Sequence, residues 1–145
     1  MHDGAEFVRS RRHDIDVVIV FLTDIVGFAA SLFTKKFFSS IKNSLTLNGM
    51  FVTLSESLHF HKKIVVRVQK TLKSVFPVVD LYTAPIATYA GNWWTFSIGS
   101  LYLDPREIRR KGRIRTKYYS PDIHASSFLP RDMYRQPERL AGRTH

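Results

Sequence analysis

The sequence of 145 residues contains no cysteine. Disulfide bonds and thiolate metal sites are therefore excluded. Long apolar runs are missing too, because the longest candidate, residues 17–33, is interrupted by Asp24 and Gly27, and a membrane span needs about 18 uninterrupted apolar residues. The first 16 residues lack the apolar segment of a signal peptide, so we expect a cytoplasmic protein without a membrane partner.

Acidic residues are few, with 12 Asp and Glu against 22 Lys and Arg and a formal net charge of +10. Such a charge attracts phosphates and acidic surfaces without specificity. The most basic stretch, residues 104–117, lacks interleaved aromatic residues, the spacing of a phosphate-binding loop and any helix-turn-helix pattern. We interpret its Arg109-Arg110-Lys111 cluster as a solvated helix end and do not expect nucleic-acid binding.

Hydrophobic periodicity predicts alternating strands and helices in a single domain. The continuous apolar run at 16–22 is typical of a parallel strand covered on both faces. Apolar residues spaced three or four apart predict a helix over 31–49, which Asn48-Gly49 would end.

The next segments continue the alternation. Residues 50–57 predict a strand, and residues 61–76 predict a second amphipathic helix that ends before Pro77. Residues 78–90 and 92–101 predict two strands that form an antiparallel pair. We therefore predict an α/β fold with about four strands and flanking helices.

Several side chains in expected loops are candidates for a binding site. Asp24 follows the carboxyl end of the first strand, the edge where open α/β sheets bind ligands, although aspartate at such a place also serves as a turn or helix-capping residue. Tyr89, Trp93 and Trp94 could line a pocket or simply pack in the core.

Two imidazoles, His59 and His61, alternate like strand residues on one face. Two imidazoles alone make a weak metal signal, so we expect no metal site. No Ser-His-Asp arrangement or nucleophile elbow is present either.

Four segments point to a family when they are taken together and in order. They are HDGAEFV (2–8), FLTDIVGFAASLF (21–33), IATYAGNWW (86–94) and KYYSPDIHASSFLP (117–130). With the element lengths between them, they resemble the C-terminal half of the spermidine synthases, the polyamine aminopropyltransferases. The resemblance implies a truncated Rossmann-like sheet of the class I methyltransferase type over residues 1–135. We expect residues 136–145 to form a disordered tail.

The resemblance also implies an activity. Members transfer an aminopropyl group from decarboxylated S-adenosylmethionine, a co-substrate, to putrescine, and they release spermidine and methylthioadenosine without a cofactor. Carboxylates suit this chemistry because they hold the cationic diamine and can accept its proton. By position, Asp3 and Gly4 match residues that contact the nucleoside donor, while Asp24 and Tyr89 match residues that hold the diamine.

The sequence departs from the family pattern at positions that carry chemistry. Phe21 stands where the family has its proton acceptor, so no catalytic residue is intact at that place, and Leu54 stands where many members have an acceptor-binding glutamine. The glycine-rich donor loop is absent from these 145 residues. We therefore expect impaired catalysis. The alternative is a non-catalytic regulatory module that pairs with a second copy or a full-length homologue through an exposed sheet edge.

Overall fold

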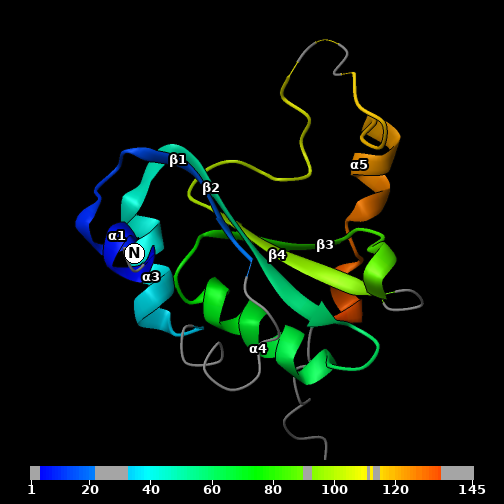
Figure 1. Cartoon of the computed structure of the whole chain (residues 1–145), viewed down its shortest axis with the longest axis horizontal. Coiled ribbons are helices and arrows are strands. Elements are labelled where there is room, and N and C mark those ends of the chain that lie inside the picture. Colours follow the sequence, from blue (N-terminus) through cyan, green and yellow to red (C-terminus); the bar gives the residue numbers. More distant parts are fainter. Residues whose placement is uncertain (1–3, 22–32, 90–92, 111, 113–114, 135–145) are drawn as a thin grey trace, which may run out of the picture.

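The computed structural model describes residues 4–21, 33–89, 93–110, 112 and 115–134. Four strands form one sheet in the order β1-β2-β4-β3 (Figure 1). Strands β1 and β2 are parallel, whereas β4 is antiparallel to both β2 and β3. The strands are β1 (Ile15–Val20), β2 (Leu45–Ser57), β3 (Val78–Thr83) and β4 (Trp94–Ser100).

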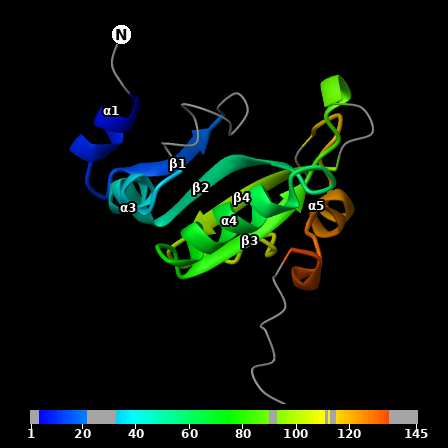
Figure 2. The same ribbon diagram turned by 90° about the horizontal axis from the view of Figure 1, so that it is seen from below.

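Short and medium helices flank this sheet. The α-helices are α1 (Gly4–Ser10), α3 (Lys35–Ser44), α4 (Lys62–Lys73) and α5 (Pro121–Ser127), and the 3₁₀ helices are η1 (Ala87–Tyr89) and η2 (Arg131–Met133). Figure 2 shows α4 lying along one face of the sheet. These observations confirm the predicted α/β class and the four-stranded sheet with its antiparallel final pair.

The main core lies between α3, α4 and the sheet face that they cover. Phe38 and Ile41 of α3, Leu72 of α4 and Phe51 of β2 are fully buried there. The hydroxyl of Thr34 accepts a hydrogen bond from the Phe37 N–H and caps the start of α3. Amphipathic periodicity, rather than any long apolar run, therefore builds this core.

The outer edge of β3 is closed by residues that follow β4. The Leu129 N–H donates to the Leu81 carbonyl over 3.1 Å, and Phe128 forms an isolated bridge with Tyr82. These contacts cover backbone groups that an edge strand otherwise leaves open.

A buried carboxylate holds this closing segment in place. Asp80 on β3 is only 1% exposed, and Arg106 binds it with two hydrogen bonds of 2.6 and 2.9 Å. Arg106 also donates to the Leu129 carbonyl, and the Tyr134 hydroxyl donates to Asp80 over 3.1 Å. One anion thus joins β3, the segment after β4 and the end of the described chain.

The electrostatics of this cluster agree with its geometry. Burial alone would raise the pKa of Asp80, but hydrogen bonds from Arg106 and the Leu81 N–H, with the positive charge of Arg106, lower it below the usual value. Burial, followed by the nearby charge of Asp80, raises the pKa of Tyr134 to about 12. The cluster is therefore stable with Asp80 ionised and Tyr134 protonated.

The structure corrects the predicted helix over 31–49. Helix α3 ends at Ser44, and Leu45 already has extended backbone and pairs with Ile15 of β1. Gly49 lies inside β2, where a Cβ atom would come within 2.9 Å of the Leu45 side chain and the Thr46 carbonyl. Glycine is therefore needed at this position because neighbouring atoms leave no room for a side chain, and it does not end the helix.

Three further predictions were wrong. Strand β1 lies at the edge of the described sheet, with Ile19 59% exposed, and is not covered on both faces. His59 lies in a turn and His61 caps α4, so the two do not share a strand face. The described residues of the basic stretch 104–117 form turns and coil and no helix end, and Arg106 within it is held by Asp80.

Among the helices that the structure describes, none has the length and apolar character that crossing a bilayer would require.

We predict that Asp80→Asn lowers the free energy of unfolding by roughly 3 kcal/mol, because it leaves the Arg106 guanidinium without its buried anion. Urea denaturation at neutral pH measures the change. Glu107→Gln is the matched control, since the Glu107–Arg109 pair is exposed and should contribute less than about 1 kcal/mol. Equal effects of the two substitutions would contradict a central role for Asp80.

Stability should also depend on pH through the same cluster. Because the pKa of Asp80 is lowered on folding, its contribution is present above a pH of about 4 and is lost as the pH falls further. Because the pKa of Tyr134 rises to about 12, its contribution is present below a pH of about 10 and is lost as the pH rises toward 12.

The variant Tyr134→Phe separates the alkaline effect from the titration of other groups. We expect the wild-type chain to be more stable by about 1 kcal/mol at pH 8, and this difference should shrink between pH 10 and 12. Urea midpoints measured for both chains across this range test the prediction. A constant difference would show that Tyr134 does not resist ionisation.

Candidate functional site

The carboxyl ends of the parallel strands β1 and β2 lie at the same edge of the sheet. Phe21 directly follows β1, and the pairing of Val20 with Thr53 places Phe21 beside Leu54 on β2. Both positions had been predicted as departures from the family pattern, and the register brings them together. Open α/β sheets bind their ligands at this edge.

An apolar surface lies on the sheet face opposite to α4, and we call it the aromatic wall. The ring of Phe96 lies 5.9 Å from that of Phe21 and is stacked on Tyr82 at 5.2 Å between centroids. Leu54 pairs with Phe96 across β2 and β4. The wall consists of Phe21, Leu54, Tyr82, Trp94 and Phe96.

The wall offers contact surface and no proton acceptor. Phe21 is 66% exposed at its outer end, whereas Leu54 and Phe96 are buried. Burial raises the pKa of the Tyr82 hydroxyl, which therefore stays protonated at neutral pH. Apart from Phe21 these residues are largely covered, and none of them carries a charge that could hold an ammonium.

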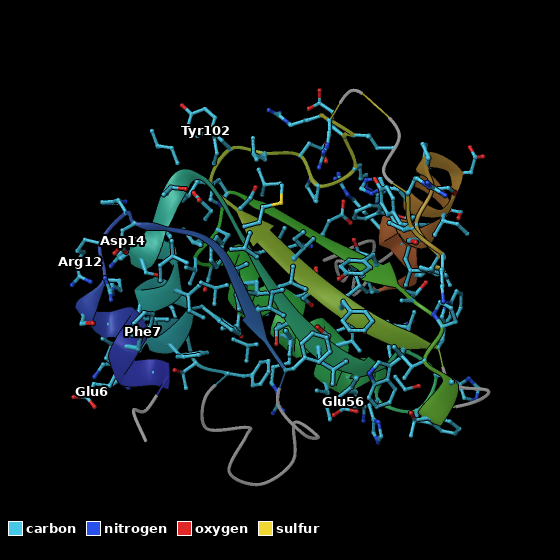
Figure 3. All side chains as sticks on the ribbon, turned by 45° about the horizontal axis from the view of Figure 1, so that its top comes forward. Glu6, Phe7, Arg12, Asp14, Glu56 and Tyr102 are labelled. Carbon is cyan, nitrogen blue, oxygen red and sulfur yellow. The ribbon has the colours of Figure 1, made fainter. Side chains whose placement is uncertain are left out.

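A carboxylate that sequence reasoning missed lies just beyond this wall. The register of β2 against β4 shifts by a bulge between Leu54 and Glu56, and Glu56, which pairs with Thr95, has a φ of 80°. Its side chain is 3% exposed, with an oxygen 3.4 Å from Nδ1 of His61, and Thr95 donates a hydrogen bond to its backbone carbonyl. Figure 3 shows Glu56 at the end of β2.

Bulges and positive φ angles at non-glycine residues concentrate next to functional sites. The sequence signal for Glu56 is an acid two residues after the apolar Leu54, inside a segment that periodicity predicts as an ordinary strand. The bulge itself depends on pairing with Thr95, which lies 39 positions away in the sequence.

The structure describes only two of the four predicted binding residues. Asp3 and Asp24 lie outside the described residues. Gly4 begins α1, and Tyr89 ends η1 in the connection between β3 and β4. The structure thus leaves their predicted roles untested.

The tryptophans have separate surroundings. Trp94 is buried in the wall at 5% exposure, which agrees with the packing interpretation, whereas Trp93 is 44% exposed. Within the part of the chain that the structure describes, no group of three or more His, Asp or Glu side chains could hold a metal ion. His61 instead faces Glu56.

The fold and the site together define a class of protein. The chain has an open α/β sheet with one parallel pair, and the carboxyl edge of that pair, where such sheets bind ligands, carries the aromatic wall and the buried Glu56. Comparison with known proteins then identifies the family. Residues 1–108 match the model of the spermine/spermidine synthase domain, and the chain belongs to this family.

Curated relatives support the assignment along nearly the whole chain. The polyamine aminopropyltransferase of Hydrogenobaculum sp. (strain Y04AAS1) is 48% identical over 134 residues, which cover 92% of this chain and 48% of that protein. Polyamine aminopropyltransferase 1 of Aquifex aeolicus (strain VF5) is 45% identical over 132 residues, which cover 91% and 47%. The chain therefore spans about half the length of these relatives.

Solved structures agree with the sequence comparison. A spermidine synthase in complex with the transition state analogue AdoDATO superimposes with a TM-score of 0.75 at 28% identity, covering 90% of this chain and 47% of that one. The spermidine synthase of Thermotoga maritima gives a TM-score of 0.70 at 25% identity, covering 91% and 45%. The four-stranded sheet thus matches part of a spermidine synthase catalytic domain.

Two substitutions at Glu56 should separate backbone strain from side-chain contacts. Both Glu56→Ala and Glu56→Gly remove the carboxylate, but only glycine adopts a φ of 80° without strain. We expect the glycine variant to be more stable than the alanine variant by about 1 kcal/mol in urea denaturation. An alanine variant of equal or greater stability would show that the bulge relaxes when the side chain is shortened.

Proposed function

We propose that this chain contributes the acceptor side of an aminopropyl-transfer site. In the reaction, the neutral amine of putrescine attacks the carbon next to the sulfonium of decarboxylated S-adenosylmethionine. The new C–N bond forms as the C–S bond breaks, and the electron pair of that bond leaves on sulfur as methylthioadenosine. The amine must give up a proton, so a base close to the nucleophile accelerates the reaction.

Family membership, with 48% identity to a polyamine aminopropyltransferase, is the observation that supports the reaction. The proposed roles follow the matching positions. Asp24 and Tyr89 would hold the diamine, and Asp3 and Gly4 would contact the nucleoside donor. Carboxylate–ammonium hydrogen bonds are strong enough to orient a flexible diamine for in-line attack.

We further propose that the chain is catalytically impaired. The aromatic ring of Phe21 occupies the position proposed for the proton acceptor and packs toward Phe96. Leu54, beside it, can form no side-chain hydrogen bond with an amine. Loss of a general base alone lowers a rate by about 10²–10⁴-fold. The buried Glu56 does not replace it in this proposal, because it already contacts His61.

A restored carboxylate should recover affinity for the acceptor. We expect Phe21→Asp to increase putrescine affinity at least tenfold in isothermal titration calorimetry, because a charge-assisted hydrogen bond contributes about 1.5–3 kcal/mol. Phe7→Asp is the matched control, since Phe7 is an exposed phenylalanine on α1. Equal affinities of the two variants would contradict an acceptor site at Phe21.

The impairment has a test of its own. The wild-type chain, incubated with decarboxylated S-adenosylmethionine and putrescine, should form no spermidine above the background rate in a chromatographic assay. Spermidine formed at ordinary enzyme rates of about 1 s⁻¹ or more would overturn the proposed impairment while supporting the proposed reaction.

A further inference from the structure

The outward side of helix α4 carries a row of positive charges. The helix covers one face of the sheet (Figure 2), and the residues on its buried side are Val65, Val68, Gln69 and Leu72. Lys63, Arg67 and Lys70 follow one another at spacings of four and three residues, so they share the opposite side, and all three are exposed. We call these three cations the α4 stripe. At 1.5 Å of rise per residue, the stripe is about 10 Å long.

No carboxylate of the described residues balances the α4 stripe. Between residues 25 and 103 the only acids in the sequence are Glu56 and Asp80. Both are buried, at 2% and 1% exposure, and they contact His61 and Arg106 respectively. The salt bridges within the described part of the chain do not include Lys63, Arg67 or Lys70.

This arrangement of charge works against the helix that carries it. Lys63 and Arg67 are four residues apart and Arg67 and Lys70 are three apart, and like charges at these spacings destabilise a helix. The first turn of α4 contains Lys62 and Lys63 and no acid, although the helix dipole favours acids at this end. Charges that weaken their own helix and form no ion pair within the described chain indicate an anionic partner.

Cations elsewhere on the described surface have acids close to them. Arg11 pairs with Asp14, and Arg109 pairs with Glu107. The basic stretch 104–117 thus contains its own carboxylates, whereas α4 contains none. The α4 stripe is therefore the described surface on which positive charge is least compensated.

The chemistry around the stripe narrows the kind of anion. No large apolar side chain of α4 is exposed, so the helix has nothing to insert into a bilayer. It also presents no aromatic ring on which an unpaired base could stack. The phosphates of a nucleic-acid duplex need neither contact, and they recur about every 3.4 Å of helix axis along each strand, so several of them lie within reach of a stripe about 10 Å long.

We propose that the α4 stripe binds the phosphate backbone of duplex nucleic acid through Lys63, Arg67 and Lys70. Contacts of this kind carry no sequence information, so binding is independent of base sequence. The stretch 104–117, from which we expected no nucleic-acid binding, is a different surface. The proposal adds a property to the chain and does not depend on aminopropyl transfer.

The test is fluorescence anisotropy with labelled duplex DNA and duplex RNA of about 20 base pairs and equal sequence, titrated with the 145-residue chain at about 50–200 mM salt. The triple variant Lys63→Gln/Arg67→Gln/Lys70→Gln should raise the dissociation constant at least tenfold at the lowest salt. It should also make the slope of log affinity against log salt shallower by about 2–3, because each phosphate contact contributes about 0.9. The duplex that binds more tightly identifies the preferred sugar.

The matched control is Arg110→Gln/Arg115→Gln/Lys117→Gln, which removes the same number of exposed positive charges from the basic stretch. Its affinity should stay within about threefold of the wild type, because salt screens charges that lie farther than about 10 Å from the bound duplex. The variant Lys63→Arg/Lys70→Arg keeps the charges and should bind like the wild type. Thermal melts should show the stripe variant at least as stable as the wild type, since it relieves like-charge repulsion.

Four results would overturn the proposal. They are the absence of duplex binding at the lowest salt, equal losses in the two triple variants, tighter binding of single-stranded than of duplex DNA, and binding of phosphatidylserine vesicles without binding of either duplex. The titrations contain neither putrescine nor decarboxylated S-adenosylmethionine, so their outcome is separate from that of the proposed transfer.

Discussion

The buried pairing of Asp80 with Arg106 is the interaction on which the rest of the structure depends. Asp80 lies on the edge strand β3, yet it is almost fully covered, because the segment after β4 and the residues up to Tyr134 converge on it. A buried carboxylate is tolerated only when its hydrogen-bonding capacity is filled, which here takes Arg106, Tyr134 and the Leu81 N–H. This requirement brings three separate parts of the chain to one edge of the sheet.

The consequence reaches the candidate site. Phe128, held next to β3, contacts Tyr82, and Tyr82 stacks on Phe96 in the aromatic wall. Arg106 itself lies 5.0 Å from the Phe128 ring centroid. The wall is therefore supported from the closed edge of the sheet, while its other end, at Phe21, lies at the open edge of β1. Contacts within the described chain hold the Tyr82 side of the wall, whereas the Phe21 side lies at an edge that no other described strand covers.

Sequence reasoning predicted what depends on local periodicity. The four strands, the amphipathic helices and the antiparallel final pair follow from patterns within about 15 residues. It missed what depends on contacts between distant positions. Asp80 and Arg106 are 26 positions apart, so nothing local distinguishes Arg106 from its basic neighbours. The bulge at Glu56 exists only because of the pairing with β4.

The contrast between local patterns and contacts of distant residues also applies to β1 and to the candidate site. An apolar run reports that a strand should be covered, but it does not say whether the cover lies within the chain, so Ile19 was placed wrongly. The departures at Phe21 and Leu54 were visible in the sequence, because a residue type alone decides whether a proton can be accepted. Their position side by side on one apolar surface required the register of β1 and β2. The roles of Asp24 and Tyr89 stay predictions.

Phe21 belongs both to the aromatic wall and to the lining of the cavity beside β1. A carboxylate at this position would place a charge beside the ring of Phe96, and burying a charge without a counter-charge is unfavourable. A phenylalanine instead continues the apolar surface of Val17 and Ile19 up to the wall.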